Sequence, residues 1–167
     1  PILTEGLEKE GIDTSRIEVD PWHNSGIAII LLDSKKENRI VVIPGANIHT
    51  SNSKLQSAES DIKDSDYLML QCEIDPNASL ASANAARQSG VKVVLDPAPA
   101  MNITKELIAS SDVLTPNQTE AKSITGIDVV DVQSARDACH ALLKFGIDAV
   151  VITIGSMGAY YASSGGD

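Results

Sequence analysis

The sequence has 167 residues and a mass of 17.6 kDa, and its 23 acidic and 13 basic side chains give a net charge of -10 at pH 7. This length suits roughly one domain of about 150 residues with a buried core. The acidic balance argues against a general nucleic-acid binder, which needs a basic face, although backbone amides can still hold nucleotide phosphates. Hydrophobic residues make up 43% and charged residues 22%, as in globular rather than disordered chains.

The cysteines and histidines predict neither a disulfide framework nor a metal site. Cys72 and Cys139 are too few for a CxxC zinc site, and each lies in an apolar stretch, so we expect two small buried thiols. His23, His49 and His140 lack the i, i+4 spacing of a helical metal pair.

No segment predicts membrane insertion or secretion. The longest apolar run, residues 26–32, is far shorter than the roughly 20 residues that span a bilayer. The start lacks a positive region followed by an apolar one, so we expect no membrane partner and, by default, a cytoplasmic protein. The first residue is Pro1 rather than Met, which indicates that the natural N-terminus is missing.

The first third of the chain predicts a helix and a β-hairpin. The helix runs to about residue 10, with Gly11 as its stop. Two β-branched runs, residues 27–32 and 39–43, flank a polar turn, and Pro44-Gly45 ends the second run.

Strands and helices alternate in the rest of the chain. This alternation implies βαβ units, and therefore a parallel sheet with helices on both faces and ligands at the carboxyl ends of its strands. The expected helices are 51–62, 77–89, 104–108, 117–126 and 132–145, and the expected strands are 67–70, 91–95, 113–114, 149–154 and 158–162.

Polar residues follow the first and third of these strands. Glu73 can accept hydrogen bonds from ligand hydroxyls, although its position alone favours a cap for the next helix. Asn117 and Glu120 have the spacing of a capping box at a helix start. The same carboxylate could instead order the waters of Mg²⁺, which takes oxygen ligands and keeps several waters.

The other strand ends carry turns of defined shape. Residues 96–100 contain two prolines and form a rigid turn, and Gly155 and Gly158 let the backbone of the turn at 153–158 approach a ligand closely. The terminal Gly165-Gly166-Asp167 follows a strand directly, so we interpret it as a hairpin turn rather than a phosphate loop. No Walker A, GxGxxG or GxSxG motif occurs, which disfavours a Rossmann dehydrogenase and a GxSxG hydrolase.

Taken in order, these segments resemble the PfkB family of sugar kinases, and within it the ribokinases. The resemblance covers essentially the whole chain, residues 1–167, and marks 26–43 as part of a β lid. The Thr-Pro-Asn-x-x-Glu-Ala and Thr-x-Gly-x-x-Gly pieces are the family's marks, and Asp96 stands where Asn is usual. The segments that carry it are Pro44-Gly45-Ala46-Asn47, Leu70-Gln71-Cys72-Glu73, Asp96-Pro97-Ala98-Pro99-Ala100, Leu114-Thr115-Pro116-Asn117-Gln118-Thr119-Glu120-Ala121, Thr125-Gly126-Ile127 and Ile152-Thr153-Ile154-Gly155-Ser156-Met157-Gly158.

The resemblance implies a ribokinase-like three-layer αβα sandwich with a mainly parallel sheet, and transfer of the γ-phosphoryl group of ATP to a primary hydroxyl of a sugar, D-ribose foremost. It assigns Glu73 to sugar hydroxyls, Asn117 to the neighbourhood of the ATP phosphates, and Glu120 to Mg²⁺ through water. It further assigns apolar sugar contacts to Ala28, Ile30 and Val42, and nucleotide contacts to Thr153, Ile154, Gly155, Ser156, Met157 and Gly158.

The departures from the family pattern point to an internal fragment. The early glycine-rich sugar motif and the late Gly-Ala-Gly-Asp motif, with its catalytic Asp and anion hole, are absent, and the adenine pocket and K⁺ site of the family would lie beyond Asp167. We therefore expect this chain alone to be inactive, with exposed sheet edges, and the complete protein to form a homodimer through the lid. Two alternatives stay open: a non-catalytic relative that binds nucleotide or sugar, and a kinase for fructose, deoxyribose or a nucleoside.

Overall fold

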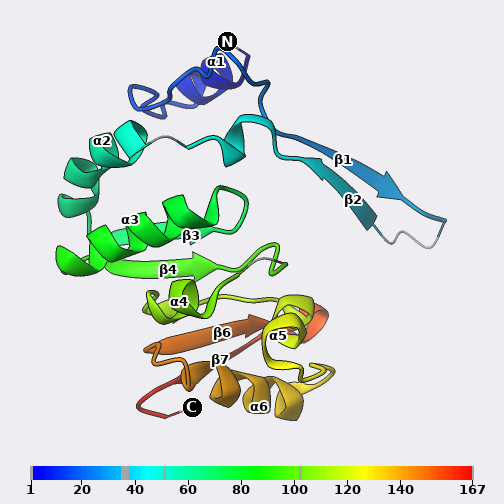
Figure 1. Cartoon of the computed structure of the whole chain (residues 1–167). Coiled ribbons are helices and arrows are strands. Elements are labelled where there is room, and N and C mark those ends of the chain that lie inside the picture. The colour runs from blue at the N-terminus through cyan, green and yellow to red at the C-terminus, as the bar shows by residue number, and fades with distance from the viewer. Residues whose placement is uncertain (1, 35–37, 51, 102, 167) are drawn as a thin grey trace. The chain divides into compact units, whose positions relative to one another are not determined.

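The computed structural model describes residues 2–34, 38–50, 52–101 and 103–166 (Figure 1). The chain divides into two compact units, Pro1–Ala46 and Asn47–Asp167. Within the described ranges, no helix combines the length and the apolar character that crossing a membrane requires.

The first unit contains helix α1 (Ile2–Lys9) and the predicted hairpin, formed by β1 (Ile27–Leu32) and β2 (Asn38–Ile43). The two strands pair antiparallel, with Ala28 opposite Val42 and Ile30 opposite Ile40. None of the described side chains of this unit is buried, and both strands are exposed along their whole length. A two-stranded hairpin of this kind is marginally stable without a covering partner. The short 3₁₀ helix η1 (Gly45–Ile48) follows β2.

The second unit holds a five-stranded sheet in the order β3-β4-β5-β6-β7, in which the first four strands are parallel and β7 is antiparallel to β6. This mostly parallel sheet with flanking helices confirms the predicted α/β fold class. Its elements are α2 (Asn52–Lys63), β3 (Tyr67–Gln71), α3 (Pro76–Gln88), β4 (Lys92–Asp96), α4 (Lys105–Ala109), β5 (Val113–Leu114), α5 (Gln118–Thr125), α6 (Val132–Leu143), β6 (Ala149–Thr153), η2 (Gly155–Met157) and β7 (Ala159–Ser163).

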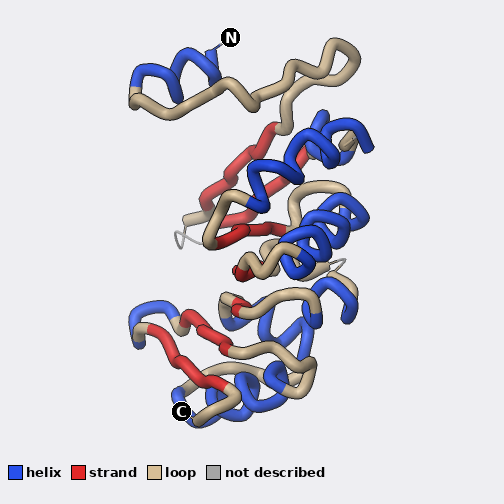
Figure 2. The backbone as a smooth tube through the Cα atoms, turned by 90° about the vertical axis from the view of Figure 1, so that its left-hand side faces the viewer, coloured by secondary structure: helices blue, strands red, loops and turns tan. Residues whose placement is uncertain are grey.

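The described α-helices of this unit lie on one side of the strands (Figure 2). Helix α3 contacts β3 and β4, α5 contacts β6, and α6 contacts β6 and β7. The side chains that face these helices form the core, and the central ones are fully buried: Val93, Leu95, Leu114, Val150 and Ile152.

The opposite face of the sheet is open in the described part of the chain. Tyr67 and Met69 on β3 are 64% and 79% exposed, and Tyr161 on β7 is 55% exposed. The described residues therefore supply two layers of the three-layer sandwich. Successive residues of each strand therefore alternate between the buried face and the open face. Val94 and Val151, on the open face, are half-buried, although their neighbours along the strand are fully buried.

Side-chain caps explain where the helices begin. Asp75 precedes α3 and accepts a hydrogen bond from Asn77 N, with Pro76 at the first helical position. Thr104 Oγ1 accepts from Leu107 N at the start of α4. These local signals account for the agreement between predicted and observed helix starts.

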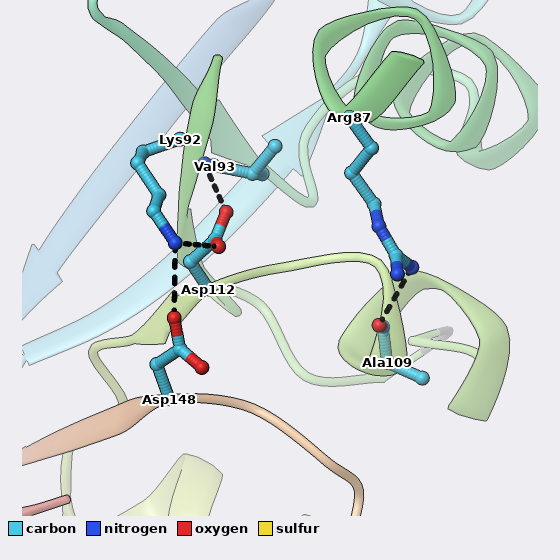
Figure 3. Close-up of polar contacts among 6 residues, drawn as sticks. All are labelled: Arg87, Lys92, Val93, Ala109, Asp112 and Asp148. Atoms are coloured by element: carbon cyan, nitrogen blue, oxygen red, sulfur yellow. Dashed lines mark hydrogen bonds and ion pairs between the residues drawn. The ribbon is translucent and has the colours of Figure 1, made fainter. Parts of the chain in front are cut away.

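One ion-pair network joins three strands at their amino ends (Figure 3). Lys92 Nζ lies 2.6 Å from Asp112 Oδ1 and 3.0 Å from Asp148 Oδ2, and Asp112 Oδ2 accepts a hydrogen bond from Val93 N at 2.7 Å. Burial alone would raise the pKa of Asp112, but the hydrogen bonds from Lys92 and Val93 outweigh it and hold the pKa below its usual value. The network therefore favours the charged carboxylate and links β4 to the segments that enter β5 and β6.

We expect Asp112→Ala to lower the free energy of unfolding by about 1–2 kcal/mol near pH 7, because Val93 N and Lys92 lose an acceptor. Asp148→Ala, at a side chain that is 63% exposed, should cost less than about 1 kcal/mol. Because the folded-state pKa of Asp112 is lowered, its contribution is present above the unfolded pKa of about 3.9 and declines as the pH falls below it. Urea unfolding near neutral pH and near pH 3 measures both effects, and equal losses from the two variants would contradict the assignment.

Candidate functional site

Four loops meet at the carboxyl edge of the parallel sheet. They follow β3, β4, β5 and β6, and the strand order places them next to one another in chain order. Backbone contacts join them beyond the regular ladders: Cys72 N donates to Ala98 O at 3.2 Å, Thr115 N to Leu95 O at 3.0 Å and Thr153 N to Pro116 O at 3.0 Å. The predicted convergence of the strand-end residues is thus present within the second unit.

Glu73 lies in the exposed turn between β3 and α3. The expectation that it caps the following helix is wrong, because the N-cap of α3 is Asp75, whose side chain accepts from Asn77 N. The carboxylate of Glu73 is not used for this cap, so it is available to accept hydrogen bonds from a ligand.

Asn117 and Glu120 form the predicted capping box at the start of α5. Asn117 Oδ1 accepts from Glu120 N at 2.9 Å, and Glu120 Oε2 accepts from Asn117 N at 2.8 Å. A carboxylate has two oxygens and about four acceptor positions, so this cap leaves capacity for a cation or its waters. The structural and the ligand-binding interpretations of Glu120 are therefore compatible.

Negative charge accumulates beside the β3 strand end. Burial is the main cause that raises the pKa of Cys72 to about 11, and the carboxylates of Asp96 and Glu120 add to it. The carboxylates of Asp96, the last residue of β4, and Glu120, in the first turn of α5, thus act on the same thiol, which stays protonated at neutral pH. The prediction of a buried thiol is confirmed for Cys139, whereas Cys72, which directly follows the last residue of β3, is half-buried.

The turn after β6 is held by a backbone hydrogen bond. Ile154 N donates to Gly158 O at 2.9 Å, which closes a tight loop around η2. Ile154 is 2% exposed as a whole residue and packs in the core, whereas Thr153, Ser156 and Met157 are exposed. The expected contact of Ile154 with a nucleotide stays a prediction. Gly155 and Gly158 have φ values of 57° and 96°, which L side chains rarely adopt.

The three expected lid residues belong to the first unit. Ala28 and Val42 are paired across the hairpin and Ile30 lies two residues further along β1, so the three share one face of the hairpin. Their expected contacts with a sugar stay a prediction.

The described residues contain no group of three or more His, Cys, Asp or Glu side chains arranged to hold a metal ion. Mg²⁺ does not require such a group, because it keeps several waters and takes further oxygens from substrate phosphates. A single carboxylate such as Glu120 fits this mode of binding.

The role of Asp96 in shaping the turn after β4 is not among the predictions from the sequence. Its Oδ1 accepts a hydrogen bond from Ala98 N at 3.2 Å, which shapes the turn after β4. An Asp two residues before a backbone amide is typical of an Asx-turn, so this pattern indicates the hydrogen bond, whereas the two prolines by themselves predict only a rigid turn.

Comparison with known proteins gives the family. The model of the pfkB family carbohydrate kinases matches residues 2–167. A ribokinase of Haemophilus influenzae is 40% identical over 163 residues, which are 98% of this chain and 53% of that protein. A deoxyribokinase of Salmonella typhimurium is 30% identical over 156 residues, or 93% of this chain and 51% of that protein.

Solved structures of ribokinases have a similar fold to that of this chain. The ribokinase from Thermotoga maritima superposes with a TM-score of 0.76 at 30% identity, covering 98% of this chain and 52% of its own. The Arabidopsis thaliana ribokinase, solved with ribose and ATP, superposes with a TM-score of 0.73 at 25% identity, covering 90% and 51%. The chain belongs to the pfkB family of carbohydrate kinases, and it spans about half the length of the curated relatives it matches.

We expect Gly158→Ala to lower the free energy of unfolding by about 1–3 kcal/mol, because its backbone, at φ 96° and ψ -130°, lies outside the regions open to alanine. Gly155→Ala is the matched control. Its φ of 57° is in the ordinary left-handed region, which should cost only about 1 kcal/mol. Denaturant unfolding of both variants measures the difference, and an unchanged stability of Gly158→Ala would refute the strained turn.

Proposed function

We propose that the complete protein transfers the γ-phosphoryl group of ATP to a primary hydroxyl of a sugar, with D-ribose as the substrate. The observation that carries the proposal is the convergence of the β3, β5 and β6 strand-end loops, which bear Glu73, the Asn117–Glu120 box and the turn at 153–158. Phosphoryl transfer depends on positioning and charge neutralisation more than on covalent chemistry, and these groups suit both tasks.

Each group has a role in this proposal. The Glu73 carboxylate accepts hydrogen bonds from sugar hydroxyls, and the backbone of residues 153–158 lies along the nucleotide. Asn117 lies near the phosphates, where the start of α5 offers favourable electrostatics. Mg²⁺ would neutralise phosphate charge, and Glu120 would orient its waters. The group that takes the hydroxyl proton is not among these residues.

The choice of sugar rests on relatives. The H. influenzae relative is named a ribokinase and is more similar to this chain than the S. typhimurium deoxyribokinase, at 40% against 30% identity. Deoxyribose is therefore the main competing substrate.

We further propose that K⁺ assists the complete enzyme, that the exposed apolar hairpin pairs with that of a second copy, and that the enzyme works in the cytoplasm.

The test is a coupled ADP-release assay with MgATP and ribose, deoxyribose or fructose. We expect the complete protein to turn over ribose with the highest kcat/KM, and the 167-residue chain alone to turn over none of the sugars. Failure of the complete protein to phosphorylate any sugar would reject the kinase proposal. Saturable ATP binding without turnover by that protein would then favour the non-catalytic alternative.

A second prediction separates the two roles of Glu120. In the complete protein, Glu120→Gln should lower kcat by about 10–100-fold and raise the Mg²⁺ concentration needed, because the amide is a poorer partner for the waters of the cation. Its stability should change little, since Gln at this position still accepts from Asn117 N.

The matched control is the second capping box, in which Asp131 accepts from Ser134 N at the start of α6. Asp131→Ala should cost about 1 kcal/mol of stability without changing the Mg²⁺ dependence. If Glu120→Gln kept full activity at low Mg²⁺, the carboxylate would be a helix cap only.

A further inference from the structure

We propose that Asp96 is a positioning residue for Glu73: by shaping the turn after β4, it anchors the neighbouring turn that carries Glu73. The inference rests on the proposed sugar-binding role of Glu73 for its functional consequence. The structural part of the argument does not depend on that role.

The first step is the shape of the β4 turn. Gln71 and Asp96 form the last rung of the β3–β4 ladder, so the two strands leave the sheet side by side. Asp96 is half-buried, and its Oδ1 accepts from Ala98 N at 3.2 Å. This hydrogen bond spans two residues and folds the chain back immediately after the strand.

The second step carries the effect to the neighbouring loop. The carbonyl of Ala98 accepts a hydrogen bond from Cys72 N at 3.2 Å, one residue beyond the end of the regular ladder. Cys72 directly precedes Glu73. The orientation of the Ala98 carbonyl, which the Asp96 side chain helps to set, therefore holds the peptide that leads into Glu73.

The third step is that Glu73 is held from two sides. After it, Asp75 accepts from Asn77 N and fixes the start of α3. Before it, the Cys72–Ala98 hydrogen bond provides the second anchor. Loss of the Cys72–Ala98 hydrogen bond leaves Glu73 attached to α3 only, in an exposed turn where its carboxylate would sample more positions.

Asp96 could alternatively act through its charge, because its carboxylate lies near Cys72 together with that of Glu120. Two substitutions separate the explanations. Asp96→Asn keeps the acceptor oxygen in place and removes the charge, whereas Asp96→Glu keeps the charge and moves the acceptor away from Ala98 N.

The first experiment measures amide hydrogen exchange at Cys72 by NMR in the complete protein. We expect exchange in Asp96→Glu to be about tenfold or more faster than in the unsubstituted protein, and exchange in Asp96→Asn to stay within about threefold. The amide of Thr153, which donates to Pro116 O in another loop, is the internal reference and should not change. Unchanged exchange at Cys72 in both variants would overturn the proposal.

The second experiment measures the kinetics of the same proteins with ribose and ATP. Asp96→Glu should raise KM for ribose by about tenfold and leave KM for ATP within about twofold, whereas Asp96→Asn should resemble the unsubstituted protein. The reverse pattern, with a defect in Asp96→Asn alone, would show that the charge matters and would reject the positioning role. If the unsubstituted protein phosphorylates no sugar, the proposed function fails, and the exchange experiment still decides the structural inference.

Discussion

Parallel pairing of β3, β4, β5 and β6 is the constraint on which the candidate site depends. Because parallel strands all end at the same edge, residues separated by up to about eighty positions in the sequence come together there. The pairing continues into the loops, where Thr153 N reaches Pro116 O and Cys72 N reaches Ala98 O. At the opposite edge, Lys92, Asp112 and Asp148 join the amino ends of β4, β5 and β6, so both ends of the sheet are tied by polar contacts.

Several groups at the carboxyl edge have a structural task and, under the proposed function, a chemical one. The Asn117–Glu120 box begins α5 and places a carboxylate beside the β5 strand end. The turn at 153–158 closes on itself through Ile154 N and Gly158 O, and the same closure presents its backbone. A motif that is common as a helix cap can therefore also carry the cation-binding role proposed for Glu120.

Much apolar surface is open in the described part of the chain. The hairpin strands β1 and β2 are exposed along their length, and one face of the sheet carries the exposed Tyr67, Met69 and Tyr161. Exposed apolar surface of this extent usually marks contact with further protein. This agrees with relatives that are about twice as long as the matched region.

Short-range patterns in the sequence are enough to predict the elements and the family motifs. The helix caps at Thr104 and Asn117, the helix that follows Asp131, the alternation of strands with helices and the Asn117–Glu120 capping box all follow from such patterns. The tertiary structure alone decided that Asp75 rather than Glu73 caps α3, that Cys72 is half-buried, and that Asp96 reaches Cys72 through Ala98. These features depend on which strand ends lie side by side, and that is settled by long-range pairing rather than by any local pattern.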